Sequence, residues 1–175
     1  DLRQLAMTEE GESINDVYTR DVIEEVTGFA IGGNIYKSFL NLLSDLKSEN
    51  QIADYQPFAY DWRYSVFDVA TEPVQYDNGE EKLLVEEVKQ LAENSFTGKV
   101  TIIGHSNGGL VAKALLEEFA GTELAGLVDK IVMIGTPQLG TPKAIPALLH
   151  GKSFDFPSSM LYDEDTLRNT TLNMP

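Results

Sequence analysis

Apolar and polar residues alternate along the chain in blocks that predict four short strands. The first, residues 21–27, is rich in β-branched side chains and passes directly into a glycine-rich stretch, residues 28–33, where glycine permits a tight turn. The others are expected at residues 55–60, 99–103 and 130–134. Pro57 places the second strand near a sheet edge or a strand end, because proline has no backbone N–H to donate.

Helical spacing of the apolar residues predicts helices between these strands. They cover residues 35–48, 80–94 and 110–120, and a short helix is possible at 143–149. The helix at 80–94 has an apolar side and a glutamate-rich side, which is the pattern of a helix packed on a core. Strands that alternate with helices, and strands that are continuous apolar runs, predict an α/β fold with a mostly parallel sheet covered by helices on both faces. Residues 1–20 show little pattern and are expected to be an irregular lead-in to a core at 21–140.

The charge balance argues against several kinds of partner. The 175 residues contain 28 Asp and Glu against 13 Lys and Arg, a formal net charge of −15. Nucleic-acid binding relies on clustered Lys and Arg, so no nucleic-acid partner is expected.

The chain has no Cys and only two His, which argues against disulfides, Cys-ligated metals and a His-rich metal site. We expect no metal at such sites, and no organic cofactor is implied.

No stretch approaches the roughly 18 consecutive apolar residues of a membrane span, so no integral membrane segment is expected. The first residues also lack the charged-then-apolar pattern of a signal peptide, which leaves the compartment open. The chain starts at Asp1 without an initiator Met and stops at Pro175, and we expect it to be a piece of a longer protein.

Residues 104–108 read Gly-His-Ser-Asn-Gly and match the pattern G-x-S-x-G, the nucleophile elbow, in which a serine lies on a strained turn between a strand and a helix. Here the pattern follows the expected strand at 99–103 and precedes the expected helix at 110–120, which is the context that the motif requires. Glycine is needed because the residues two before and two after the serine come so close that side chains would collide. Ser106 is thus the expected nucleophile, and the alternative is a purely structural glycine turn.

A serine nucleophile needs donors for the oxyanion and a general base. The backbone N–H of Asn107, at the start of the following helix, is one expected donor. The second is expected from residues 28–33, at Phe29 or its neighbour Ala30, unless this stretch is a simple turn.

The base has no convincing candidate. His105 adjoins the nucleophile and is expected to point elsewhere as a packing residue, and His150 is expected to be exposed in an irregular segment. Either His remains an alternative as the base. Asp155, Asp163 and Asp165 are candidate acids by position only, with solvated surface as the simpler interpretation.

Four segments together resemble the lecithin:cholesterol acyltransferase family of α/β-hydrolases. They are the Gly28-Phe29 loop, Phe-Ala-Tyr-Asp-Trp-Arg at residues 58–63, the elbow with its following glycine at 104–109, and Ile-Gly-Thr-Pro-Gln-Leu-Gly at 134–140. The resemblance implies that Ser106 accepts the acyl group, that Phe29 and Asn107 supply the oxyanion amides, and that residues 60–63 buttress the site. For Asp61 and Arg63 we expect a partly buried ion pair in preference to direct catalysis.

In that family the acid and the His follow a cap over the acyl pocket. The resemblance therefore implies that residues 141–175 begin a cap and that the α/β-hydrolase sheet is incomplete at the C-terminal end of this chain. It also implies a lipid substrate.

The sequence thus predicts a serine esterase or lipase, or an O-acyltransferase, that forms an acyl-Ser106 intermediate from a carboxylic ester. Water or a lipid hydroxyl would then accept the acyl group. The alternative is a non-catalytic or inactive α/β-hydrolase fragment with a binding or structural role, because the acid and the His are not found. A third possibility is that a second copy of the chain supplies the missing acid and His. The sequence leaves the oligomeric state open.

Overall fold

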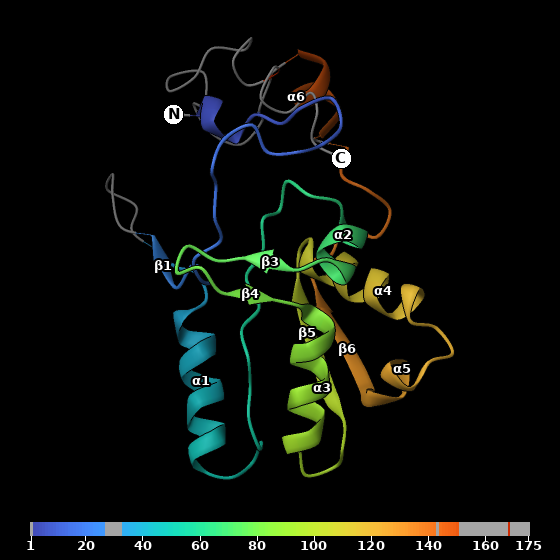
Figure 1. The fold of residues 1–175 in the computed structure, drawn as a ribbon. Helices are drawn as coiled ribbons and strands as arrows, with labels where there is room; N and C mark the ends of the chain where they lie inside the picture. Colours follow the sequence, from blue (N-terminus) through green and yellow to red (C-terminus); the bar gives the residue numbers. More distant parts are fainter. Residues whose placement is uncertain (1, 27–32, 143, 151–167, 169–175) are drawn as a thin grey trace.

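The central feature of the fold is a pair of parallel strands, β5 (Val100–His105) and β6 (Val128–Ile134). This computed structural model describes residues 2–26, 33–142, 144–150 and 168. Two helices, α4 (Gly108–Glu118) and α5 (Glu123–Leu127), connect the strands and lie to their right in Figure 1. A helical crossover between parallel strands is the unit that the sequence pattern predicts, so the α/β class is confirmed.

The apolar core lies between this strand pair and three helices, α4, α2 (Val66–Thr71) and α3 (Leu84–Asn94). The buried cluster consists of Val69, Ala70, Val85, Val88, Val111, Ala114, Leu115 and Leu124. On α3 the apolar residues Val85 and Val88 are buried while Glu86 is exposed, as helical spacing predicts. Each fully buried aliphatic side chain stabilises the fold by about 1.5–3 kcal/mol, so this layer holds the strand pair in place.

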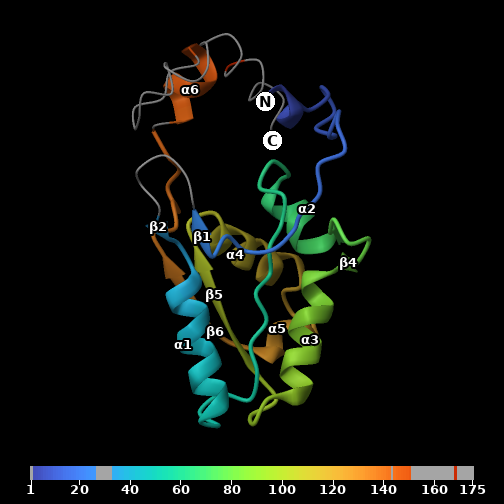
Figure 2. The ribbon, with the colours of Figure 1, turned by 90° about the vertical axis from the view of Figure 1, so that its left-hand side faces the viewer.

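The opposite face of the strand pair is only partly covered. Side chains alternate along a strand, so Ile103 of β5 and Val132 and Ile134 of β6 point away from the core, and they are 42%, 42% and 50% exposed. α1 (Lys37–Ser48) begins on this side (Figure 2). Tyr36, directly before α1, contacts His105 of β5. Within the described residues β5 and β6 are the only strands paired in parallel, so these residues do not form the wide parallel sheet that we predicted.

Two antiparallel hairpins complete the strands of the described chain. In the first, β1 (Glu25–Val26) pairs with β2 (Gly33–Asn34), so the predicted strand at 21–27 is shorter than expected and antiparallel. In the second, β3 (Val74–Gln75) pairs with β4 (Glu81–Lys82). This pairing occupies the start of the helix that we expected at 80–94, and α3 therefore begins only at Leu84.

Two local predictions were wrong. Residues 55–60 form no strand, and with no N–H at Pro57 a continuous ladder could not form there. α2 was missed, although Ser65 supplies a recognisable start signal: its hydroxyl accepts a hydrogen bond from the Asp68 N–H at 3.1 Å. α6 (Ala144–His150) agrees with the short helix expected at 143–149.

The N-terminal segment is attached to the core. It begins with a 3-10 helix, Leu2–Leu5, and isolated bridges join Met7 to Ser13 and Thr19 to Tyr76. Met7 is buried, with 2% of its surface exposed. The irregular backbone that we expected is therefore held by specific contacts.

Candidate active site

The elbow at Ser106 has the local geometry that the motif predicts. β5 ends at His105, α4 begins at Gly108, and Ser106 between them has a φ of 52°, in the left-handed region that side chains rarely adopt. The Ser106 N–H donates to the carbonyl of Ile134 at 2.9 Å, which ties the turn to the end of β6. Ser106 itself is exposed. The turn thus presents the hydroxyl at the carboxyl ends of both strands.

The glycines around Ser106 differ in how much space a side chain would find at each position. A Cβ at Gly104 would lie 2.6 Å from the Cα and N atoms of Gly109, so the strand and the helix approach too closely for any side chain. A Cβ at Gly109 would lie 2.0 Å from Oγ1 of Thr136, in the loop after β6. Gly108, by contrast, has only the Tyr60 hydroxyl within reach, at 3.9 Å. The collision expected two residues after the serine is therefore absent, and the crowded position is one residue further on.

Gly104→Ala should destabilise the protein by about 2–3 kcal/mol, because the new methyl group meets backbone atoms that cannot rotate away. The matched variant Gly108→Ala, with open space at its Cβ, should change the free energy of unfolding by less than about 0.5 kcal/mol. Urea unfolding of both variants measures the difference. Equal stability of the two variants would contradict the close approach of β5 and α4.

Asn107 is the N-cap residue of α4, and its N–H donates to no acceptor within the described part of the chain. An unpaired N–H at the start of a helix can stabilise negative charge. Burial raises the pKa of Tyr60, and the polar side chain of Asn107 opposes the rise, so the phenol is neutral at neutral pH. The other expected amide donor, Phe29, and its neighbour Ala30 lie outside the described residues.

Neither His lies in hydrogen-bond contact with Ser106. His105 points to the opposite face of β5, where its Nδ1 lies 2.6 Å from the Tyr36 hydroxyl and its ring meets the Tyr36 ring edge to face. His150 is exposed in the last turn of α6. The described residues offer the Ser106 hydroxyl no hydrogen-bond partner, and Asp155, Asp163 and Asp165 lie outside them.

Asp61 and Arg63 form the partly buried ion pair that we expected. The Arg63 side chain is 1% exposed and that of Asp61 is 15% exposed, and Nη2 of Arg63 lies 2.5 Å from the Asp61 carboxylate. Arg63 also donates to the Leu5 carbonyl at 3.2 Å and to the Ser13 hydroxyl at 2.9 Å. These two partners in the N-terminal segment were not predicted, because a contact across 50 or more residues leaves no local pattern.

The loop after β6 closes over the start of α4. Gly135 has a φ of 61°, and the chain then turns so that Thr136 packs on Gly109. The Thr136 hydroxyl is buried without a hydrogen-bond partner among the described residues. Ile134 and Thr136 therefore contact the elbow directly.

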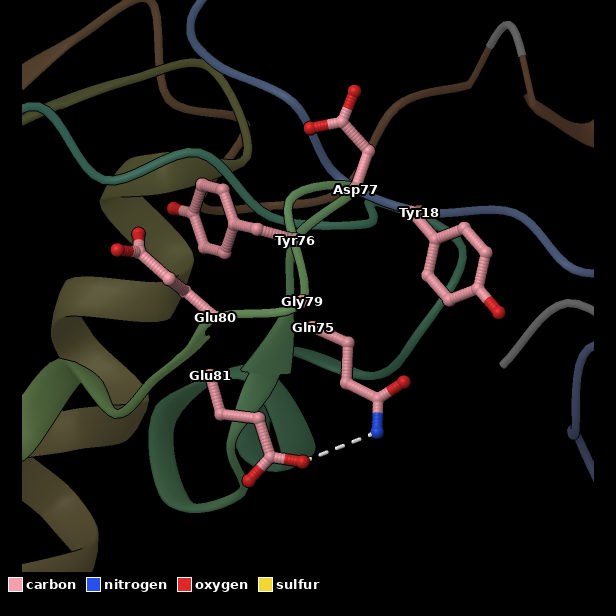
Figure 3. A pocket seen from close by; sticks show the side chains of 7 residues that line it. All are labelled: Tyr18, Gln75, Tyr76, Asp77, Gly79, Glu80 and Glu81. Carbon is pink, nitrogen blue, oxygen red and sulfur yellow. Dashed lines mark hydrogen bonds between the residues drawn. The ribbon is translucent and has the colours of Figure 1, made fainter.

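A separate pocket lies on the second hairpin. It has a volume of about 410 Å³ and is lined by Tyr18, Gln75, Tyr76, Asp77, Gly79, Glu80 and Glu81 (Figure 3). Asp77 pairs with Arg20 at 2.9 Å, and Lys82 lies 4.7 Å from the centre of the Tyr76 ring. No residue of the elbow lines this pocket, so it is not part of the candidate active site.

The described residues contain no group of three or more His, Cys, Asp or Glu side chains that could hold a metal ion. No helix among them has the length and apolar content needed to cross a membrane.

Comparison with known proteins identifies the family. No curated protein and no solved structure shows significant similarity to the chain. The family model for lecithin:cholesterol acyltransferase, however, matches residues 22–172. This match includes β5, the Ser106 turn, α4 and the loop after β6. Because it covers most of the sequence, the chain belongs to the lecithin:cholesterol acyltransferase family.

Proposed function

We propose that Ser106 is the nucleophile of a serine-dependent acyl hydrolase or O-acyltransferase that acts on carboxylic esters of lipids. The main support is the conformation of Ser106, a non-glycine residue with a φ of 52° at the junction of a parallel strand and a helix. Such a conformation costs about 1–3 kcal/mol and is concentrated at functional sites. Membership of an acyltransferase family supports the reaction class and a lipid substrate.

In the proposed reaction, Oγ of Ser106 attacks the ester carbonyl carbon while its proton passes to a general base. The carbonyl oxygen becomes an oxyanion, which the N–H of Asn107 stabilises together with a second amide, proposed to be that of Phe29. The intermediate collapses to acyl-Ser106, and the departing alcohol takes the proton from the base. Water or a lipid hydroxyl then attacks the acyl group and releases Ser106. No step requires a metal or an organic cofactor.

The exposure of Ser106 is consistent with these roles, and so is the lack of an acceptor for the Asn107 N–H among the described residues. An ester carbonyl can approach the hydroxyl from solvent, and the N–H is free to donate to the new oxyanion. The dipole of the three-turn helix α4 favours negative charge at the same point.

One observation favours a second candidate function. Because no described residue hydrogen-bonds to the Ser106 hydroxyl, the chain by itself could be a non-catalytic module with a binding or structural role. A serine without a base attacks slowly, since its hydroxyl is almost fully protonated near neutral pH. The two candidates therefore differ in the reactivity of Ser106.

A fluorophosphonate probe distinguishes the two functions, because it phosphonylates activated serines. We expect mass spectrometry of digested protein to find the adduct on Ser106 and on no other serine, with labelling slowed by an excess of a lipid ester. The probe is applied to this chain alone and to the full-length protein. Labelling in neither would support the non-catalytic function, and labelling that rises more than linearly with protein concentration would indicate a site completed by a second copy.

A further inference from the structure

The residue before Ser106 is anchored from a distant part of the chain. Nδ1 of His105 lies 2.6 Å from the hydroxyl of Tyr36, and the two rings meet edge to face with centroids 5.7 Å apart and an interplanar angle of 72°. The two residues are 69 positions apart in the sequence. A hydrogen bond and an aromatic contact thus act on one side chain at the end of β5.

Tyr36 is well placed to serve as a fixed support. It is the N-cap residue of α1, and the N–H groups of Ile35, Tyr36 and Lys37 all donate to the carbonyl of Glu24, at 2.9, 3.2 and 3.3 Å. The Lys37 side chain also pairs with Glu25 of β1 at 3.0 Å. The backbone beneath Tyr36 is therefore held by contacts that do not involve the elbow.

The elbow needs such a support because the conformation of Ser106 is intrinsically unfavourable. Left-handed φ values in residues other than glycine persist only where the surroundings hold them. The contact of Gly104 with Gly109 of α4 and the hydrogen bond from Ser106 to Ile134 at the end of β6 provide part of this constraint. On the face of the strand pair away from the core, where Ile103 of β5 and Ile134 of β6 are half exposed, the Tyr36 hydroxyl contacts His105.

We infer that Tyr36 is a positioning residue for acyl transfer, which holds Ser106 in its reactive orientation by anchoring the His105 side chain. This inference rests on the proposed role of Ser106 as nucleophile. It also gives His105 a function other than that of general base, because Nδ1 is engaged by Tyr36 on the face of β5 away from the core. A displacement of the nucleophile by about 1 Å is enough to lower a rate substantially.

Tyr36→Phe tests the inference, because it removes the hydroxyl and keeps the ring. In hydrolysis of p-nitrophenyl butyrate by the full-length protein, we expect kcat to fall about tenfold with KM unchanged within twofold. The matched control is Tyr76→Phe, which also removes one tyrosine hydroxyl hydrogen bond, to the Ala59 carbonyl at 2.8 Å, on the second hairpin. It should lower Tm to a similar extent but leave kcat within twofold of the wild type.

Variants of His105 test whether Tyr36 acts on Ser106 through the His105 side chain. His105→Ala should lower kcat as much as Tyr36→Phe, and the double variant should be no worse than either single variant, because both remove the same contact. His105→Asn, whose amide can take the position of Nδ1, should restore most of the rate. Additive losses in the double variant would overturn the inference.

Amide hydrogen exchange supplies a readout that does not depend on activity. In Tyr36→Phe we expect exchange in peptides covering residues 104–110 to become about tenfold faster, with no change at residues 74–82. If Ser106→Ala is as active as the wild type, the proposed function fails, and exchange alone then decides whether Tyr36 orders the elbow. If Ser106 is essential but Tyr36→Phe keeps wild-type kcat, the positioning role is wrong.

Discussion

Replacing Ser106 by alanine should lower the rate of ester hydrolysis by the full-length protein at least about 10³-fold. The loss follows because the acyl-enzyme route needs Oγ, and only the amide donors remain to stabilise an attack by water. Initial rates with p-nitrophenyl butyrate, with the protein shown to be folded by circular dichroism, measure the effect. Undiminished hydrolysis would remove Ser106 from the reaction.

Ser106→Gly should show the same loss of activity together with a gain in stability. Ser106 has a φ of 52°, and glycine adopts this conformation without the steric cost that a side chain brings, a difference of about 1 kcal/mol. The serine would thus be retained at the expense of stability, which is expected where a strained residue serves a function. Thermal unfolding of Ser106→Gly and Ser106→Ala measures the difference.

The chain contains a matched control for this effect. Asn50, after the end of α1, has a φ of 55° and lies outside the candidate site. Asn50→Gly should stabilise the protein by less than Ser106→Gly, because asparagine tolerates left-handed φ better than serine, and its hydrolysis rate should equal that of the wild type. If Ser106→Gly were less stable than the wild type, the turn would not be strained as we describe.

Arg63→Met should destabilise the protein by about 3–5 kcal/mol, the second large effect that we expect. The substitution leaves the carboxylate of Asp61, which is 15% exposed, without its partner, and removes the donors to the Leu5 carbonyl and the Ser13 hydroxyl. A buried charge that loses its partner is strongly destabilising, even where the intact pair adds little net stability. Urea unfolding followed by tryptophan fluorescence measures the loss.

Two further variants separate the causes of this loss. The double variant Asp61→Asn with Arg63→Met should recover part of the stability, because no unpaired charge remains. Lys130→Met breaks the exposed pair with Asp129, in which the side chains are 70% and 47% exposed, and should change stability by less than about 0.5 kcal/mol.

Limited proteolysis of Arg63→Met should cut first within residues 2–20, since Arg63 joins that segment to the core. An Arg63→Met variant as stable as Lys130→Met would show that this attachment is unimportant.

The sequence pattern was most informative where the structure depends on neighbouring residues. β5, β6 and α4 begin and end within two residues of their predicted bounds, because an apolar run, a glycine turn and an Ala-rich helix are all local signals. The strand-to-helix turn at Ser106 was predicted for the same reason. The roles of Ser106, Asn107 and Phe29 in catalysis remain predictions.

Contacts between distant residues had no counterpart in the pattern. The attachment of Leu5 and Ser13 to Arg63 and the contact of Tyr36 with His105 depend on where the folded chain brings each residue. Hydrophobic periodicity reports which face of an element is buried, and not which partner it meets. The Arg63 pair was an exception only in part, since its two members are separated by a single residue.

Local sequence is therefore sufficient to place a left-handed serine between a strand and a helix, because glycine content and apolar spacing limit the backbone over about ten residues. Folding in three dimensions supplies what holds that serine: the carbonyl of Ile134, the Cα of Gly109 against Gly104, and the hydroxyl of Tyr36 on His105. These groups come from β6, α4 and the start of α1. Their meeting depends on the packing of whole elements, which no short stretch of sequence encodes.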